Sequence, residues 1–236
     1  MIGILDSGIG GLASYNVLRR VLVREPLIYL ADRKNAPYGP RSESELIRLV
    51  GNGVRELCTL GADHVLLACC TASTVHYALP KELRRITLPI IEPAAIRAVA
   101  LGDRITVIST THTARSHAFA RSICCIRSGS AVTEIDAQPL VGMVESGARD
   151  GNLGKAESLY LDRLAAEILG HMPHVLILGC THFSHLEGEL RARLCGVEIV
   201  SPAREGALTL ADRIGTTGIG ARKNATDTYT EASVRN

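Results

Sequence analysis

Two short segments, half a chain apart, each end an apolar run in a cysteine followed by a threonine. Segment 64–71 reads His-Val-Leu-Leu-Ala-Cys-Cys-Thr, and segment 174–181 reads His-Val-Leu-Ile-Leu-Gly-Cys-Thr. A cysteine at a strand end with a helix starting behind it lies in the positive field of the helix terminus, which lowers the pKa of the thiol. The same terminus offers free backbone N–H groups to a carboxylate. The segments therefore predict two thiol bases, each beside an anion site.

The first segment offers two candidates for the thiol equivalent to Cys180. An ungapped alignment pairs Cys180 with Cys70, although Cys69 also fits. Because adjacent strand residues point to opposite faces, only one of the two can face a cleft. No pair of cysteines has C-x-x-C spacing, which argues against zinc or a thioredoxin-like redox site. We interpret the other cysteines as small buried hydrophobes: Cys58, Cys124, Cys125 and Cys195.

A glycine-rich corner, residues 6–12, reads Asp-Ser-Gly-Ile-Gly-Gly-Leu and opens a helix. Gly8, Gly10 and Ala13 fit a dinucleotide-binding fingerprint, with Asp32 about twenty residues further on, so an oxidoreductase is one alternative. Against it, Asp6 stands where its carboxylate would face a pyrophosphate. In a third interpretation the glycines only permit a tight turn.

Polar side chains near the two thiols could exchange protons with them. His182 follows Cys180 by two positions, and Asp6 belongs to a corner that we expect beside Cys69. A carboxylate or imidazole in contact with a thiol can accept or supply its proton. His182 could instead cap a helix. Glu145, at the end of an apolar stretch, is by itself typical of a surface helix.

The elements that position these residues alternate between apolar runs and amphipathic stretches. Continuous apolar runs indicate strands buried on both faces of a parallel sheet, and apolar residues at three-to-four spacing over 43–60 and 155–170 indicate helices. This is the pattern of an α/β fold, in which ligands bind at the carboxyl ends of the strands. The predicted strands are Ile2–Leu5, Leu27–Ala31, His64–Ala68, Ile105–Ile108 and Val175–Leu178.

The repeated cysteine corner predicts two similar, pseudo-two-fold-related α/β lobes, with mainly parallel sheets flanked by helices and one cleft between them. Prolines at 89 and 93 predict a crossover into the second lobe. We expect residues 1–92 plus 206–236 to form the first lobe and 93–205 the second. The polar end of the chain, 224–236, is expected to be a loose tail.

Composition favours a small-molecule enzyme. The 236 residues carry a net charge of +2, so nothing indicates a nucleic-acid or anionic membrane partner. Aromatic residues make up 3% and Trp is absent, which disfavours stacking on bases. No apolar run reaches the roughly 20 residues of a membrane span. The odd cysteine count without a signal peptide predicts a reducing, cytoplasmic location. A homodimer is left open.

Several segments taken together resemble glutamate racemase, within the aspartate/glutamate racemase superfamily. They are 6–12, 107–116, 139–147 and 176–183, with Asp32, Ser42 and the run 37–39. The resemblance implies a two-lobed racemase for a small acidic amino acid, with no cofactor and no metal, that supplies D-glutamate for peptidoglycan. Independently, none of the four lysines stands at a strand end where a Schiff base would be expected.

The resemblance also implies roles for individual residues. Cys69 and Cys180 match the catalytic thiols: one thiolate removes the α-proton while the opposite thiol donates a proton to the other face. Asp6, Glu145 and His182 match the supporting acids. The implied substrate contacts are Ser7, Pro37, Tyr38, Gly39, Cys70, Thr71, Thr113 and Thr181.

Cys70 is the main departure from the family. It stands where asparagine is usual, and a thiol cannot replace the two N–H donors of an amide. Altered selectivity or weak activity would follow. Racemisation of aspartate or another amino acid, and a non-catalytic binding or regulatory protein on the same scaffold, are therefore alternatives.

Overall fold

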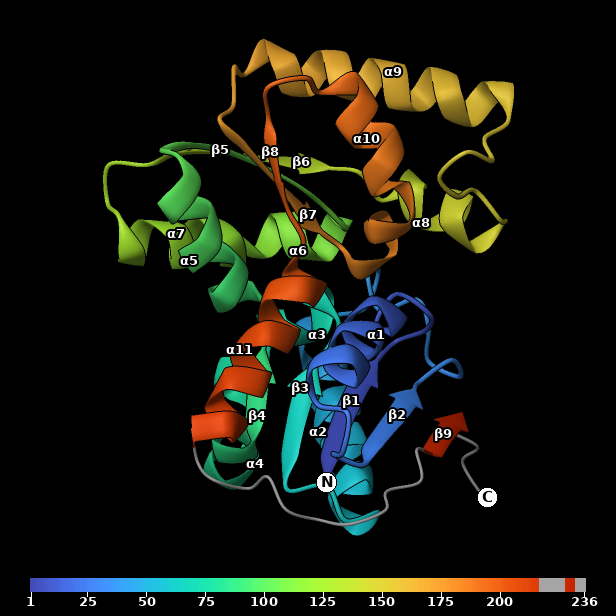
Figure 1. The fold of residues 1–236 in the computed structure, drawn as a ribbon, viewed down its shortest axis with the longest axis vertical. Helices are drawn as coiled ribbons and strands as arrows, with labels where there is room; N and C mark the ends of the chain where they lie inside the picture. The colour runs from blue at the N-terminus through green and yellow to red at the C-terminus, as the bar shows by residue number, and fades with distance from the viewer. Residues whose placement is uncertain (217–227, 232–236) are drawn as a thin grey trace.

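Two parallel β-sheets, one above the other, organise the computed structural model, which describes residues 1–216 and 228–231 (Figure 1). The first sheet and its helices comprise β1 (Ile2–Asp6), α1 (Leu12–Val21), β2 (Leu27–Ala31), α2 (Glu43–Thr59), β3 (His64–Leu67), α3 (Cys70–Thr74), the 3-10 helix η1 (His76–Ala78), α4 (Lys81–Ile86), β4 (Thr87–Pro89) and β9 (Thr228–Glu231). The second comprises α5 (Ile91–Leu101), β5 (Arg104–Ser109), α6 (Thr111–Ser116), α7 (Ala118–Ile126), β6 (Ala131–Asp136), α8 (Pro139–Glu145), α9 (Lys155–Gly170), β7 (Val175–Gly179), the 3-10 helix η2 (Thr181–Leu186), α10 (Glu187–Arg193) and β8 (Glu198–Val200). The long helix α11 (Pro202–Thr216) follows.

The strand orders confirm the internal repeat. The first sheet runs β4-β3-β1-β2-β9, and the second, read from its far edge, runs β8-β7-β5-β6. The strands β4, β3, β1 and β2 of the first sheet thus correspond, in that order, to β8, β7, β5 and β6 of the second. Every neighbouring pair is parallel. Cys69 and Cys180 therefore follow equivalent strands, β3 and β7, and the predicted two-lobed α/β fold is confirmed.

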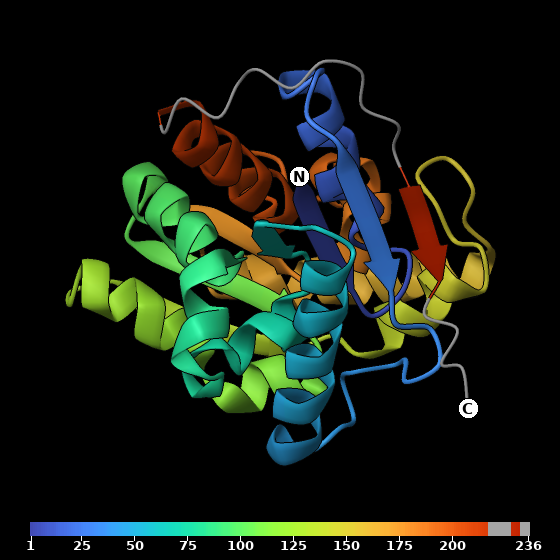
Figure 2. The ribbon, with the colours of Figure 1, turned by 90° about the horizontal axis from the view of Figure 1, so that it is seen from below.

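The five predicted strands are all present. Four further strands were not predicted: β4, β6, β8 and β9. β4 and β8 are three residues long, and β6 lies at a sheet edge with mostly half-exposed or exposed side chains. Edge strands lack the continuous apolar pattern of central ones because one side faces solvent. In the polar tail, residues 228–231 form β9 alongside β2 (Figure 2), so the expectation of a loose tail was wrong there. The rest of 224–236 lies outside the described residues.

The core alternates along the strands in the way that a doubly covered sheet requires. In β3 and just after it, Leu66, Ala68 and Cys70 face one cluster of buried side chains. Leu67 and Cys69 face another cluster, on the α2 side of the sheet. The first cluster also holds residues of α5, α11, β5 and β7, so it extends from one sheet to the other. The two lobes thus share one continuous apolar layer.

The chain passes from the first sheet to the second through β4 and α5. Pro89 ends β4, and Pro93 lies in the first turn of α5, where the missing N–H breaks no helical hydrogen bond. Helix α11 packs on both α1 and α5. The lobe boundaries, 1–92 plus 206–236 and 93–205, stay a prediction, and 217–227 and 232–236 lie outside the described residues. No helix of the described chain is long and apolar enough to cross a membrane.

Candidate active site

The two cysteine corners have the same backbone conformation. Cys69 (φ −136°, ψ 124°) and Cys180 (φ −142°, ψ 134°) are both extended, and a short helix begins at the next residue in each case. Both side chains line the same small cavity between the lobes, with a volume of about 20 Å³. Cys70, by contrast, begins α3 and packs in the shared apolar core, 1% exposed. Cys69 is therefore the counterpart of Cys180. The prediction that the other cysteines are buried was wrong, because Cys58 is half-buried and three are exposed: Cys124, Cys125 and Cys195.

Most of the predicted site residues lie around this cavity. Ten line it: Ser7, Pro37, Tyr38, Gly39, Cys69, Thr71, Glu145, Cys180, Thr181 and His182. Three lie behind the lining. Asp6 is fully buried, Thr113 bonds to Thr71, and Cys70 faces the core and does not line the cavity.

Four lining residues were not predicted: Ala36, Thr110, Gln138 and Val141. Thr110 caps the N-terminus of α6, and its hydroxyl lies 3.0 Å from that of Thr71 and 2.9 Å from that of Thr113. The run Ser-Thr-Thr-His-Thr at 109–113 carries a capping signal that could have identified Thr110. Gln138 and Val141 carry no such signal, because they reach the cavity only through the packing of α8.

Asp6 and Ser7 support Cys69 from the neighbouring strand β1. The Ser7 Oγ lies 3.8 Å from the Cys69 Sγ. Asp6 Oδ2 accepts hydrogen bonds from the backbone N–H groups of Gly8 and Gly11, both at 3.0 Å, and from the Tyr29 hydroxyl at 3.2 Å. Its Oδ1 is buried with no hydrogen-bond partner in the described part of the chain. One carboxylate oxygen thus fixes the corner and leaves the other uncommitted.

The glycine-rich corner packs against the second lobe, which excludes the dinucleotide interpretation. A Cβ added to Gly10 would clash with the Thr181 Oγ1 and lie 2.9 Å from the His182 backbone nitrogen. The N–H groups of Gly8 and Gly11, which a pyrophosphate would need, already donate to Asp6. The glycines therefore allow two pieces of protein, one from each lobe, to approach closely.

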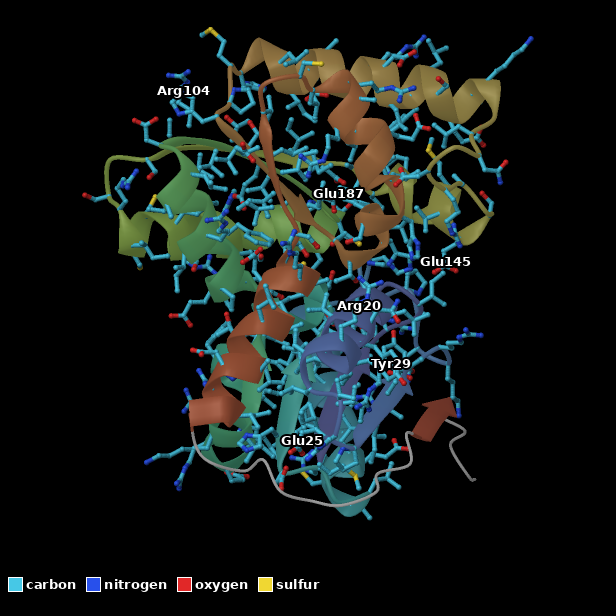
Figure 3. The ribbon with its side chains drawn as sticks, in the orientation of Figure 1. Arg20, Glu25, Tyr29, Arg104, Glu145 and Glu187 are labelled. Carbon is cyan, nitrogen blue, oxygen red and sulfur yellow. The ribbon has the colours of Figure 1, made fainter. Side chains whose placement is uncertain are left out.

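His182 and Glu145 support Cys180. The His182 Nδ1 lies 3.8 Å from the Cys180 Sγ, and its Nε2 lies 2.8 Å from the Glu145 Oε1. Because a carboxylate only accepts, Nε2 carries a proton toward Glu145, and Nδ1 is the ring nitrogen that faces the thiol. Glu145 lies at the junction of the lobes, with its side chain 55% exposed (Figure 3). The arrangement is a thiol–imidazole–carboxylate relay.

Both thiols are buried, and the prediction of a net lowering of their pKa values was wrong. Burial, and then the charge of Asp6, raises the pKa of Cys69 to about 11. Burial, and then the charge of Cys69, raises the pKa of Cys180 well above its ordinary value. Backbone N–H groups of the following helices do act in the opposite direction on each pKa, but these helices are a single turn or two and do not outweigh desolvation.

The donors around the cavity are neutral. Among the residues that line it there is no lysine or arginine. Thr71, Thr110 and Thr113 form a cluster of hydroxyls, and the Tyr38 hydroxyl donates to Asp32 at 2.7 Å. Burial, then the charge of Asp32, raises the pKa of Tyr38, so it stays a donor. Across the described residues, no three His, Cys, Asp or Glu side chains form a group that could hold a metal ion.

Comparisons with known proteins place the chain in a family. The sequence pattern of the Asp/Glu/Hydantoin racemase family matches residues 16–210. A glutamate racemase from Desulforudis audaxviator is 33% identical over 219 residues, which cover 90% of this chain and 78% of the relative. A glutamate racemase isoform from Bacillus anthracis has a similar structure, with a TM-score of 0.90 and 27% identity, covering 99% of this chain and 88% of that one. The glutamate racemase of Francisella tularensis, solved with D-glutamate, has a TM-score of 0.89 at 23% identity, covers 99% of this chain and 88% of that one, and shows the shared fold.

The fold and the paired thiols define an enzyme of the racemase class, an isomerase. The chain belongs to the Asp/Glu/Hydantoin racemase family. The racemase function predicted from the sequence is thereby confirmed.

Proposed function

We propose that this enzyme interconverts L- and D-glutamate by moving the α-proton between Cys69 and Cys180, without a cofactor. The observation that carries the proposal is the equivalent placement of two buried thiols, one from each lobe, on the lining of one cavity. The relatives that share about a third of the sequence are named glutamate racemases, which supports glutamate as the first substrate to test.

Each thiol has its own acceptor for the proton that it must lose before it can act as a base. Cys180 delivers its proton to the His182 Nδ1, and Glu145 then stabilises the imidazolium that forms. Cys69 is near Asp6, whose Oδ1 has no other partner among the described residues. The ammonium group of a bound amino acid brings positive charge next to both sulfurs, which lowers the pKa of a thiol in a buried site.

The reaction then needs two proton transfers at one carbon. A thiolate takes the α-proton, forming an S–H bond and leaving the electron pair on the α-carbon. The opposite thiol donates its proton to the other face of that carbon and becomes the thiolate. The intermediate is stabilised by preorganised donors, and the Ser7 hydroxyl and the backbone N–H groups at the start of α3 and η2 lie beside the sulfurs.

The cavity is smaller than the proposed substrate. A volume of about 20 Å³ admits little more than a water molecule, so a dicarboxylic amino acid enters only when the lobes or their loops separate. Reclosure would exclude water and strengthen every electrostatic interaction with the intermediate. We further propose that the product D-glutamate serves peptidoglycan synthesis. The cytoplasmic location and the homodimer stay predictions.

Incubation of each glutamate enantiomer in deuterated water under reducing conditions tests the proposal. We expect loss of optical activity from either enantiomer, with one solvent deuterium incorporated at the α-carbon of the product. Polarimetry and proton NMR measure the two quantities on one sample, and the exposed-cysteine variant Cys124→Ser is the control. Racemisation without deuterium would contradict the two-thiol mechanism. Exchange with aspartate alone would support an aspartate racemase, and glutamate binding without exchange a non-catalytic protein.

A further inference from the structure

Gln138 lines both the small cavity and a larger outer basin. The basin has a volume of about 520 Å³. Five residues line both spaces: Ala36 and Pro37 from the first lobe, and Gln138, Val141 and Glu145 from the segment that contains α8. Any amino acid that reaches the thiols from the basin passes these side chains. Of the five, only Gln138 carries a neutral hydrogen-bond donor.

The carboxamide of Gln138 is held by its oxygen. Gln138 Oε1 accepts a hydrogen bond from the Thr111 backbone N–H at 3.3 Å. The same oxygen packs against Gly39 of the other lobe, where an added Cβ would lie only 2.5 Å away. The absence of a side chain at Gly39 therefore makes room for this carboxamide. Its Nε2, with two N–H groups, has no hydrogen-bond partner in the described part of the chain.

An acidic amino acid brings one carboxylate more than a neutral one, and the cavity must recognise it without a lysine or an arginine. The nearby hydroxyls are largely committed, because Thr71 and Thr110 bond to each other and Tyr38 donates to Asp32. Glu145 lines both spaces and repels a second carboxylate, whereas Arg33 lines the basin and not the cavity. A fixed amide with two free N–H groups is the donor that offsets this repulsion.

We propose that Gln138 is a specificity-determining residue, whose Nε2 donates to the side-chain carboxylate of the substrate and thereby favours acidic over neutral amino acids. This inference rests on the proposed function, because it concerns the same cavity and the same substrate. Hydrogen bonds to a charged group contribute enough to change relative affinity roughly ten- to hundredfold.

The variant Gln138→Glu tests this with little change in shape. It keeps an oxygen for the Thr111 N–H but replaces the two donors by an anionic acceptor. We expect the ratio of kcat/KM for glutamate to kcat/KM for glutamine, both followed as α-hydrogen exchange in deuterated water, to fall at least tenfold. Most of the change should be in KM for glutamate. Gln138→Met, which removes the donors without adding charge, should lower the ratio less.

Ser146→Ala, at the end of the same helix and outside both cavities, is the matched control and should leave the ratio unchanged. Thermal unfolding of each variant shows whether the fold is kept. A purely structural role would lower kcat/KM for both substrates equally, and an unchanged ratio in Gln138→Glu overturns the inference. Failure of the wild-type protein to exchange the α-hydrogen of glutamate would instead overturn the proposed function, so the two failures are distinguishable.

Discussion

The Cys69 corner and the Cys180 corner share a backbone conformation and differ in the titratable group beside the thiol. Both cysteines are extended residues at equivalent strand ends, less than a tenth exposed. Near Cys69 this group is the carboxylate of Asp6, fully buried and fixed by three donors. Beside Cys180 it is the imidazole of His182, held by a carboxylate that is half exposed. The repeat therefore duplicated the position of the thiol but not the titratable group next to it.

Thermodynamics limits how the difference between the two corners can appear in the kinetics. Two enantiomers have equal free energies, so any variant must change kcat/KM for the L- and the D-substrate by the same factor. The difference between the corners can appear only in kcat and KM separately, or in how isotope is partitioned between recovered substrate and product. Variants at the two corners should therefore be compared by these quantities, and by the size of their shared loss.

The largest effect is expected from replacing either thiol. Cys69→Ser and Cys180→Ser should each lower kcat/KM roughly a thousandfold or more, because a hydroxyl is a far weaker acid than a thiol and does not form the anion that must remove the α-proton. The double variant should be little worse than either single one, since the two thiols act as a unit. Activity in both directions by polarimetry is the measurement. A double variant with wild-type activity would refute the two-thiol mechanism and make the two corners irrelevant to catalysis.

Next in size are substitutions in the Cys180 relay. His182→Asn removes the acceptor of the thiol proton and should lower kcat/KM roughly a hundredfold. Glu145→Gln keeps an oxygen for Nε2–H but loses the charge that stabilises the imidazolium, and should cost about tenfold because the side chain is half exposed. Steady-state kinetics with both enantiomers measure these losses. A larger loss in Glu145→Gln than in His182→Asn would contradict the assignment of the imidazole as the acceptor of the thiol proton.

A smaller effect is expected from the contact between the glycine-rich corner and the second lobe. Gly10→Ala should push Thr181 and His182 away from the first lobe and lower kcat/KM roughly tenfold, because a methyl group there overlaps both. At Gly8 the nearest atoms to an added Cβ, on Glu145 and His182, lie at an ordinary 3.8 Å, so Gly8→Ala should change kcat/KM much less. Kinetics and thermal unfolding of the pair would test this. A reversed order would mean that the lobes do not close on Gly10.

The sequence predicted the parts of this site that depend on strand ends. Asp6, Cys69 and Cys180 follow continuous apolar runs. The first parallel sheet brings Asp6 and Cys69 to one edge, and Cys180 stands at the equivalent end of β7 in the second sheet. It could not predict Gln138 or Val141, because these reach the cavity through the docking of a seven-residue helix from the other lobe. The thiol pKa values were mispredicted for a related reason. A helix terminus is visible in a sequence, whereas the burial that outweighs it depends on how closely the two lobes pack.

The smallest expected effect concerns stability in alkali, and it isolates the burial of the Cys69 thiol. Its pKa is raised from an ordinary 9.0 to about 11 in the folded protein, so the folded state binds this proton more tightly than the unfolded chain does. The stabilisation is complete below pH 9 and is lost as pH rises through 11, by about 1 kcal/mol at pH 10. Urea unfolding should therefore show that the free energy of unfolding falls between pH 8 and pH 10 by about 1 kcal/mol less for Cys69→Ser than for the wild type.

The exposed control Cys124→Ser should lose as much unfolding free energy as the wild type. If Cys69→Ser lost as much stability as the wild type, the Cys69 thiol would not be desolvated in the ligand-free protein. The helix terminus, and not burial, would then determine the pKa of this thiol.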